Sequence, residues 1–295
     1  MSGERVMRYK VALAQGPSLL GDVAGCLRRA EQEIQRAREA GARLIAFPEM
    51  FLGGYLLMDG RDHETLYRIA ESVHGRSVAR LIELAREYDL HIVMGMPLRS
   101  ERVDGIIYDA AVLVGPEGVI GVHRKVGLPT GYYVGRWFYD GNYVKPGNRL
   151  DVFDTPLGRI GLLIGYEIMW PELARILAAK GAQHIVVISA SPDNTDRFHN
   201  MVLPVRAMEN TVYLSYVNLH DVEHEVLFFG GSRVISPTGS QHDDKSNRRG
   251  EDLLVATVDL NLVARVRAAY PNLRDRAAVA SSLEELARDF PEPYL

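Results

Sequence analysis

The feature that most limits the folds open to this chain is a series of short apolar runs rich in β-branched residues. Several of these runs are continuously apolar instead of alternating, so we expect strands that are covered on both faces, by helices and by another sheet. The runs are VALAQ, RLIAFPE, HIVMGM, AAVLVGP, RIGLLIGY, HIVVISA, TVYLSYVN, SRVISP and LLVATVDL.

Helical stretches separate these runs. In the clearest one, apolar residues recur every three or four positions between residues 23 and 37, with Asp22 as a candidate N-cap and Gly41 as a stop. Further helices are expected from about Ser77 to Tyr88 and after Pro171. The alternation of strands and helices predicts an α/β layered fold.

Domain organisation follows from what interrupts this alternation. No Pro/Ser-rich linker, low-complexity tract or short repeat occurs, so we expect one domain spanning residues 1–295. The segment from Leu128 to Asn148 is rich in Gly, Tyr and Pro and is long for a plain connection, which favours a functional loop.

Charge and composition argue against several function classes. The net charge is -4, and no Lys/Arg block could follow a phosphate backbone, so we expect no nucleic-acid partner. The N-terminal segment lacks an apolar signal region and no run of about 18 apolar residues occurs, so we expect a cytoplasmic protein without a membrane partner. The single cysteine, Cys26, excludes an intramolecular disulfide and a multi-cysteine metal cage.

Three positions could place chemistry at the ends of predicted strands. Glu49 closes RLIAFPE, Lys125 lies in HRKVGLP, and Gly165 ends RIGLLIG just before a helix. Open α/β sheets bind ligands at the carboxyl ends of their strands, and a strand that runs into a tight turn and a helix has the geometry of a nucleophile elbow. Taken alone, Glu49 and Lys125 could equally be solvated surface residues.

Together these segments resemble the glutamate, lysine and cysteine regions of the nitrilase (carbon-nitrogen hydrolase) superfamily, in its amidase and carbamoylase branch. The resemblance covers nearly all of the chain, through FPEMFLGGY, RKVGLP, KPGNRLDVFDTPLGRIGLLIGYEIMWPE, VRAMENTVYLSYVN and FFGGSRVISPTG. It implies a four-layer αββα sandwich that forms a homodimer or a larger homo-oligomer. The implied activity is hydrolysis of a small-molecule amide, carbamoyl amide or nitrile through a covalent intermediate, with no cofactor and no metal.

The resemblance also implies roles for individual residues. Glu49 would be the general base, and Lys125 would stabilise the tetrahedral oxyanion, aided by the backbone N–H of Tyr166. A second family carboxylate, normally a glutamate, would fall on Asp140, whose side chain is one methylene shorter.

Gly165 stands where the family has its nucleophilic cysteine, and glycine has no side chain with which to form an acyl-enzyme. Cys26 is expected to pack in the core instead, on the apolar face of the first helix. Three interpretations stay open: a cysteine replaced to inactivate an ordinary amidase, a natural enzyme that uses Glu49 and Lys125 for non-covalent or non-hydrolytic chemistry, and a binding protein without activity. Retention of the Glu49, Lys125 and Asp140 charges argues against the last.

Two further patterns have structural interpretations. His220, Glu223 and His224 spell H-x-x-E-H, but they lie between two strand-like runs, so we expect an exposed polar loop and not a zinc site. The pairs Gly53-Gly54 and Gly230-Gly231 have no G-x-G-x-x-G context and predict tight turns.

Aromatic residues flank the candidate catalytic positions. We expect some of them to line the mouth of the site and to bind the substrate, which would then have an apolar or aromatic body. The candidates are Tyr55, Tyr133, Trp137 and Trp170, with Tyr132 and Phe138 nearby. Arg136 could supply a cation from the same segment, although a solvated arginine fits equally. The C-terminal tail, about residues 261–295, is expected to reach across to a dimer partner.

Overall fold

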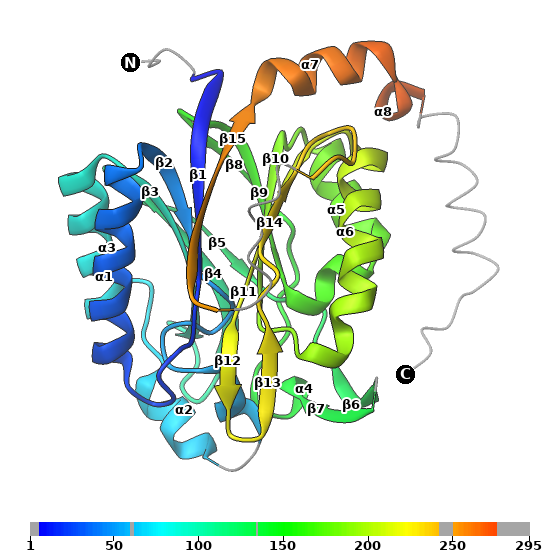
Figure 1. Ribbon diagram of the computed structural model, residues 1–295. Helices are drawn as coiled ribbons and strands as arrows, with labels where there is room; N and C mark the ends of the chain where they lie inside the picture. Colours follow the sequence, from blue (N-terminus) through cyan, green and yellow to red (C-terminus); the bar gives the residue numbers. More distant parts are fainter. Residues whose placement is uncertain (1–5, 60–61, 134, 242–249, 276–295) are drawn as a thin grey trace.

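Two β-sheets form the centre of the molecule (Figure 1). The computed structural model describes residues 6–59, 62–133, 135–241 and 250–275. In sheet order, the first sheet consists of β15 (Asp252–Asp259), β1 (Arg8–Gln15), β2 (Ala42–Ala46), β3 (His91–Arg99), β4 (Ile107–Gly115) and β5 (Gly118–Arg124). The second consists of β14 (Arg233–Ile235), β11 (Tyr213–Asn218), β10 (His184–Ser189), β9 (Gly158–Ile164) and β8 (Val152–Thr155).

Each sheet has parallel strands at its centre and antiparallel strands at its edges. Strands β1, β2 and β3 run parallel, as do β9, β10 and β11. The outer strands β15, β4, β8 and β14 pair antiparallel with their neighbours. This arrangement suits strands that are buried on both faces, because parallel pairs require crossovers that place helices over the sheet.

The outer face of the first sheet is covered by α1 (Val23–Glu39) and α3 (Arg76–Tyr88). The Asp22 carboxylate accepts a hydrogen bond from the Gly25 N–H at 2.8 Å and so caps the start of α1, as the sequence predicts. The chain turns away after the helix at Gly41, where φ is +79°. Cys26 lies on the buried face of α1, which confirms its predicted place in the core.

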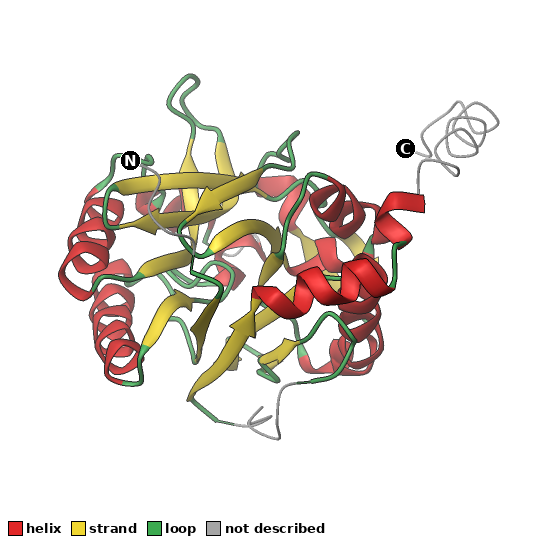
Figure 2. Ribbon diagram, turned by 90° about the horizontal axis from the view of Figure 1, so that it is seen from above, coloured by secondary structure: helices red, strands yellow, loops and turns green. Residues whose placement is uncertain are grey.

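The outer face of the second sheet is covered by α5 (Pro171–Ala179) and α6 (Asp196–Asn210). Between the sheets, aliphatic side chains from both interdigitate, among them Leu13, Val93, Leu162 and Ile188. Seen from above, the two sheets lie between outer helices (Figure 2). The predicted four-layer αββα sandwich is therefore confirmed.

The smaller elements gather at one end of the sandwich, the lower end in Figure 1. They are η1 (Tyr55–Asp59), α2 (His63–Ile69), β6 (Thr130–Tyr133), β7 (Arg136–Tyr139), α4 (Asp140–Tyr143), η2 (Gly165–Met169), η3 (Asp193–Thr195), β12 (His220–Glu223) and β13 (Val226–Phe229). The Gly- and Tyr-rich segment expected to be a functional loop thus forms a short hairpin, β6–β7, followed by one helical turn.

The described part of the C-terminal tail packs on its own chain. It comprises α7 (Leu260–Ala269) and α8 (Asn272–Asp275). The Arg267 guanidinium donates to the carbonyl of Ala182 at 2.6 Å, and the Asn272 amide donates to the carbonyl of Glu209 at 2.6 Å. Residues 276–295 lie outside the described part, so contact between the tail and a partner stays a prediction. No described helix is long and apolar enough to cross a membrane.

Candidate active site

Four of the predicted site residues come together at the end of the sandwich where the smaller elements gather. Glu49 follows β2, Lys125 directly follows β5, Gly165 follows β9, and Asp140 begins α4. Strands β2 and β5 belong to the first sheet and β9 belongs to the second, so the site forms where the two sheets meet. The structure therefore brings together residues that the sequence separates widely.

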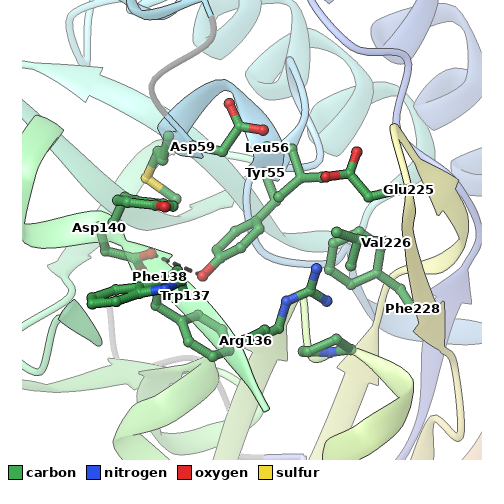
Figure 3. A pocket seen from close by; sticks show the side chains of 13 residues that line it. Tyr55, Leu56, Asp59, Arg136, Trp137, Phe138, Asp140, Glu225, Val226 and Phe228 are labelled. Atoms are coloured by element: carbon green, nitrogen blue, oxygen red, sulfur yellow. Dashed lines mark hydrogen bonds between the residues drawn. The ribbon is translucent and has the colours of Figure 1, made fainter. Parts of the chain in front are cut away.

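A buried ammonium group links the charged residues of the site. Lys125 Nζ donates to Glu49 Oε1 at 2.5 Å and to Asp140 Oδ2 at 2.8 Å. The Tyr55 hydroxyl donates to Asp140 Oδ1 at 2.9 Å, a bond drawn in Figure 3. All four side chains are buried, so these charge-assisted bonds act in a low-dielectric environment.

The surroundings shift the pKa values of this cluster. Burial alone would lower the pKa of Lys125, but the charges of Asp140, Glu49 and Asp109 outweigh it and hold the pKa well above its usual value. The lysine is therefore a permanent cation. Burial raises the pKa of Asp140, and the charge of Lys125 opposes that rise.

Sequence reasoning did not identify Asp109, a third carboxyl group in the cluster. Asp109 is fully buried on β4, and its Oδ2 lies 3.4 Å from Lys125 Nζ. Neither carboxyl oxygen has a hydrogen-bond donor among the described residues. Burial, followed by the charge of Glu49, raises the pKa of Asp109 well above its usual value, which favours the protonated form of this carboxyl group. The sequence does contain a sign of this role, because Asp109 is an ionisable residue inside an otherwise apolar strand.

The three carboxyl groups raise the question of a metal site. One oxygen from each of Glu49, Asp109 and Asp140 lies within 4.8 Å of the others, close enough for a divalent cation. However, the Lys125 ammonium lies within 3.4 Å of all three carboxyl groups and supplies a positive charge there. The donor set is therefore organised around the lysine and does not fit a metal ion.

Gly165 has the backbone of a nucleophile elbow without a side chain. Its φ is +46°, in the left-handed region. A Cβ atom at this position would overlap Oε2 of Glu49. That oxygen accepts a hydrogen bond from the Ala190 N–H at 2.7 Å. The Glu49 carboxylate therefore fills part of the volume that a side chain at position 165 would need.

The turn at Gly165 is held by Glu167, which the sequence analysis did not single out. Glu167 is fully buried and accepts hydrogen bonds from the Ile164 N–H at 2.7 Å and the Val126 N–H at 2.6 Å. Its Oε2 also accepts from His123 Nε2 at 2.8 Å. Glu167 thus ties the Gly165 turn to the segment that bears Lys125.

Two adjoining cavities open beside this cluster. The smaller, about 40 Å³, is lined by Glu49, Lys125, Gly165 and Tyr166. The larger, about 250 Å³, is shown in Figure 3 and has walls that include Trp137, Val226 and Phe228, with the Arg136 guanidinium inside it. Tyr55, Phe138 and Pro192 line both cavities. A ligand could therefore place a small head beside Lys125 and a larger body in the outer space.

The remaining aromatic candidates differ in position. Trp137 lines the larger cavity and is 60% exposed. Trp170 lines neither cavity, and its ring packs edge-on against Tyr166 with centroids 5.7 Å apart. The side chain of Tyr133 lies outside the described part of the structure.

The smaller cavity also has a polar wall that sequence reasoning missed. Ser191 and His199 both line it, with Ser191 Oγ 3.1 Å from His199 Nε2. Burial lowers the pKa of His199 to about 4, so the imidazole is neutral near pH 7. Ser191 lies just after a predicted strand, which could have marked it as a site residue. Its partner His199 lies on the following helix, so the pair is not evident from the sequence.

The prediction of an exposed loop for the H-x-x-E-H segment was wrong. His220–Glu223 is strand β12, which pairs antiparallel with β13. Glu223 is buried and accepts hydrogen bonds from the Leu56 N–H at 2.9 Å, the Tyr55 N–H at 3.3 Å and the Ser18 hydroxyl at 3.0 Å. Because the hairpin folds over η1, the glutamate fixes the segment that bears Tyr55 and has no zinc-binding arrangement.

Comparison with known proteins gives consistent matches over most of the chain. Residues 10–268 match the family model for carbon-nitrogen hydrolases. A nitrilase of Pyrococcus abyssi is 32% identical over 241 residues, which cover 81% of this chain and 85% of that protein. An (R)-stereoselective amidase of a Pseudomonas species is 31% identical over 274 residues, covering 92% and 93%.

A solved structure resembles this chain over a similar extent. It is a variant of an amidase from a Nesterenkonia species, with the acetamide moiety of fluoroacetamide covalently added at its active site cysteine. The two structures superpose with a TM-score of 0.75 at 25% identity, covering 96% of this chain and 97% of the amidase.

Proposed function

This chain belongs to the carbon-nitrogen hydrolase family, and from that membership we propose that it hydrolyses a small non-peptide amide or carbamoyl amide in the smaller cavity. The observation that supports this most is the buried Lys125 ammonium, bonded to Glu49 and Asp140 in the cavity wall. In this proposal Lys125 stabilises the developing oxyanion, Glu49 activates water and Asp140 holds the lysine in place.

The reaction does not pass through a thioester at position 165. Glycine offers no attacking atom, and in this proposal Gly165 takes the position of the nucleophilic cysteine that the sequence resemblance implies. Because Glu49 already extends into the adjacent volume and is held there by the Ala190 N–H, the pocket is organised around a glycine. This supports a natural cysteine-free enzyme over an amidase inactivated by a single replacement.

The larger cavity suggests the kind of substrate. Leu56, Trp137, Phe138 and Phe228 form an apolar part of its wall, and Asp59, Arg136 and Glu225 form a charged part. A cavity of about 250 Å³ beside the reactive head favours amides that have an apolar or aromatic body.

A homodimer is part of the proposal. Phe198, Met201, Val205 and Met208 recur every three or four residues along α6 and are between 38% and 54% exposed. Such an exposed apolar stripe on one helix face is typical of a protein–protein interface. A second copy of this chain is the occupant that the family resemblance implies.

The test of the activity compares the chain with its Glu49→Gln variant on a panel of amides and carbamoyl amides. Loss of the base should lower kcat by roughly 100-fold or more. A surface change, Glu251→Gln, provides the control, since Glu251 lies away from both cavities and pairs only with Arg29 in the described structure. Equal turnover by the chain and by Glu49→Gln would refute the proposed role of Glu49.

A further inference from the structure

A serine and a histidine face each other in the wall of the smaller cavity. Ser191 Oγ lies 3.1 Å from His199 Nε2, and both residues line the same space as Lys125 and Gly165. Ser191 follows β10 by two residues, and His199 lies in the first turn of α6. Neither residue has a role in the glutamate–lysine chemistry described above.

The hydrogen bonds around His199 fix the direction of the serine proton. His199 Nδ1 lies 3.0 Å from the carbonyl oxygen of Thr195, which can only accept, so Nδ1 bears the hydrogen. In the neutral ring, Nε2 then has its lone pair free, and the Ser191 hydroxyl donates to it. The serine is therefore bonded to a base whose tautomer is set by a third group.

The bonds behind Ser191 agree with this direction. Ser189 Oγ lies 2.6 Å from Ser191 Oγ and donates to it, because the single Ser191 hydrogen points to His199. The Tyr216 hydroxyl in turn donates to Ser189 Oγ at 3.3 Å. One ordered series of hydrogen bonds thus runs from Tyr216 to the Thr195 carbonyl.

The backbone of Ser191 is held rigidly. Its N–H donates to Asn218 Oδ1 at 2.7 Å, and its carbonyl accepts from Asn218 Nδ2 at 3.1 Å. The preceding N–H, of Ala190, donates to Glu49. Fixed backbone contacts therefore hold Ser191 beside Glu49, as a reacting group requires.

We infer that Ser191 is the nucleophile of this pocket, with His199 as its general base and the substrate an amide of the class proposed above. The inference rests on the proposed function for its substrate, and on geometry for its residues. It assigns the attacking atom that position 165 lacks.

The reaction then has two steps. Ser191 Oγ attacks the carbonyl carbon while its proton moves to His199 Nε2, and the oxyanion forms beside Lys125. His199 returns the proton to the leaving nitrogen, the C–N bond breaks, and an acyl ester stays on Ser191. Water deprotonated by Glu49 attacks the ester, the serine oxygen leaves with that proton, and the carboxylic acid is released.

The test uses p-nitrophenyl acetate, whose acetyl group does not depend on amide recognition. The Glu49→Gln variant is incubated with this ester and quenched in acid, and the acetylated residues are located by peptide mass spectrometry. We expect acetyl-Ser191 to accumulate there, because deacylation is slowed. His199→Gln should slow the release of nitrophenolate by roughly 100-fold.

The chain provides a matched control for a buried serine–histidine pair. Ser215 Oγ lies 2.7 Å from His184 Nε2, but both residues lie in the core and line neither cavity. Ser215→Ala should leave acetylation of Ser191 unchanged. Ser191→Cys keeps the volume and a nucleophile, so it should form an acetyl thioester even if Ser191→Ala folds poorly.

The outcomes separate the two proposals. Acetyl-Ser191 without turnover of any amide would support the nucleophile and contradict the proposed function. Amide hydrolysis that persists in Ser191→Ala, with no acetyl-Ser191 in Glu49→Gln, would overturn the nucleophile and leave direct attack by water.

Discussion

Glu49 and Gly165 share one volume in this structure, since a Cβ atom on the glycine would overlap Oε2 of the glutamate. The carboxylate is fixed there by the Ala190 N–H and by Lys125. A side chain at position 165 therefore cannot be added without moving the proposed base.

This overlap predicts the cost of a side chain at position 165. Gly165→Ala should lower the free energy of unfolding by about 2 kcal/mol or more, from the positive φ and the overlap together. Gly105→Ala is the matched control, since Gly105 has φ +81° and no atom within 4 Å of an added Cβ. It should cost only about 1 kcal/mol. Equal losses in urea unfolding would show that Glu49 does not occupy the space.

The ammonium of Lys125 should be essential to the fold as well as to the site. Lys125→Met leaves the Glu49 and Asp140 carboxylates buried without their cation, so the free energy of unfolding should fall by about 3–5 kcal/mol. Lys10→Met removes an exposed ammonium, which within the described part of the chain donates to the Ala40 carbonyl, and should change stability by less than about 1 kcal/mol. A loss below about 1 kcal/mol for Lys125→Met would contradict the charge assignment.

Asp109 predicts a specific pH dependence of stability. Its pKa is raised in the folded state, so the folded chain keeps a proton that the unfolded chain releases above about pH 4. The contribution of Asp109 to the free energy of unfolding is therefore fully present at low pH and is lost as the pH rises. Above about pH 4, the free energy of unfolding should fall more steeply with rising pH than in Asp109→Asn, by up to about 1.4 kcal/mol per pH unit. Parallel curves from urea unfolding would show that Asp109 is ionised; Asp104→Asn is the exposed control.

The apolar stripe on α6 predicts a dimer that a charge can separate. Met201 is 54% exposed at the centre of this stripe, and Met201→Glu should place two like charges at the proposed interface. Sedimentation at micromolar concentration should give a dimer for the chain and a monomer for the variant. Met7→Glu, at an exposed methionine outside the stripe, should stay dimeric. A monomeric unmodified chain would remove this proposal.

The layered fold could be predicted because continuously apolar runs leave few alternatives. Each run named in the sequence contributes to a strand of one of the two sheets. Glu49, Lys125 and Gly165 could be grouped because each belongs to a motif that resembles a family pattern.

Other parts of the site depend on tertiary contacts that no local pattern reveals. Asp109 becomes part of the cluster only because β4 lies beside the segment that bears Lys125. Ser191 and His199 meet because α6 folds back beside the end of β10. Glu223 was misinterpreted because its hydrogen-bond partners lie on η1, far away in the sequence.

The most direct test of a cysteine-free amidase is amide hydrolysis by the chain and by Gly165→Cys, measured side by side on one panel of amides and carbamoyl amides. We predict turnover by the unmodified chain, with no need for a thiol at position 165. Hydrolysis that appears only with Gly165→Cys would contradict it and identify the chain as a disabled cysteine hydrolase.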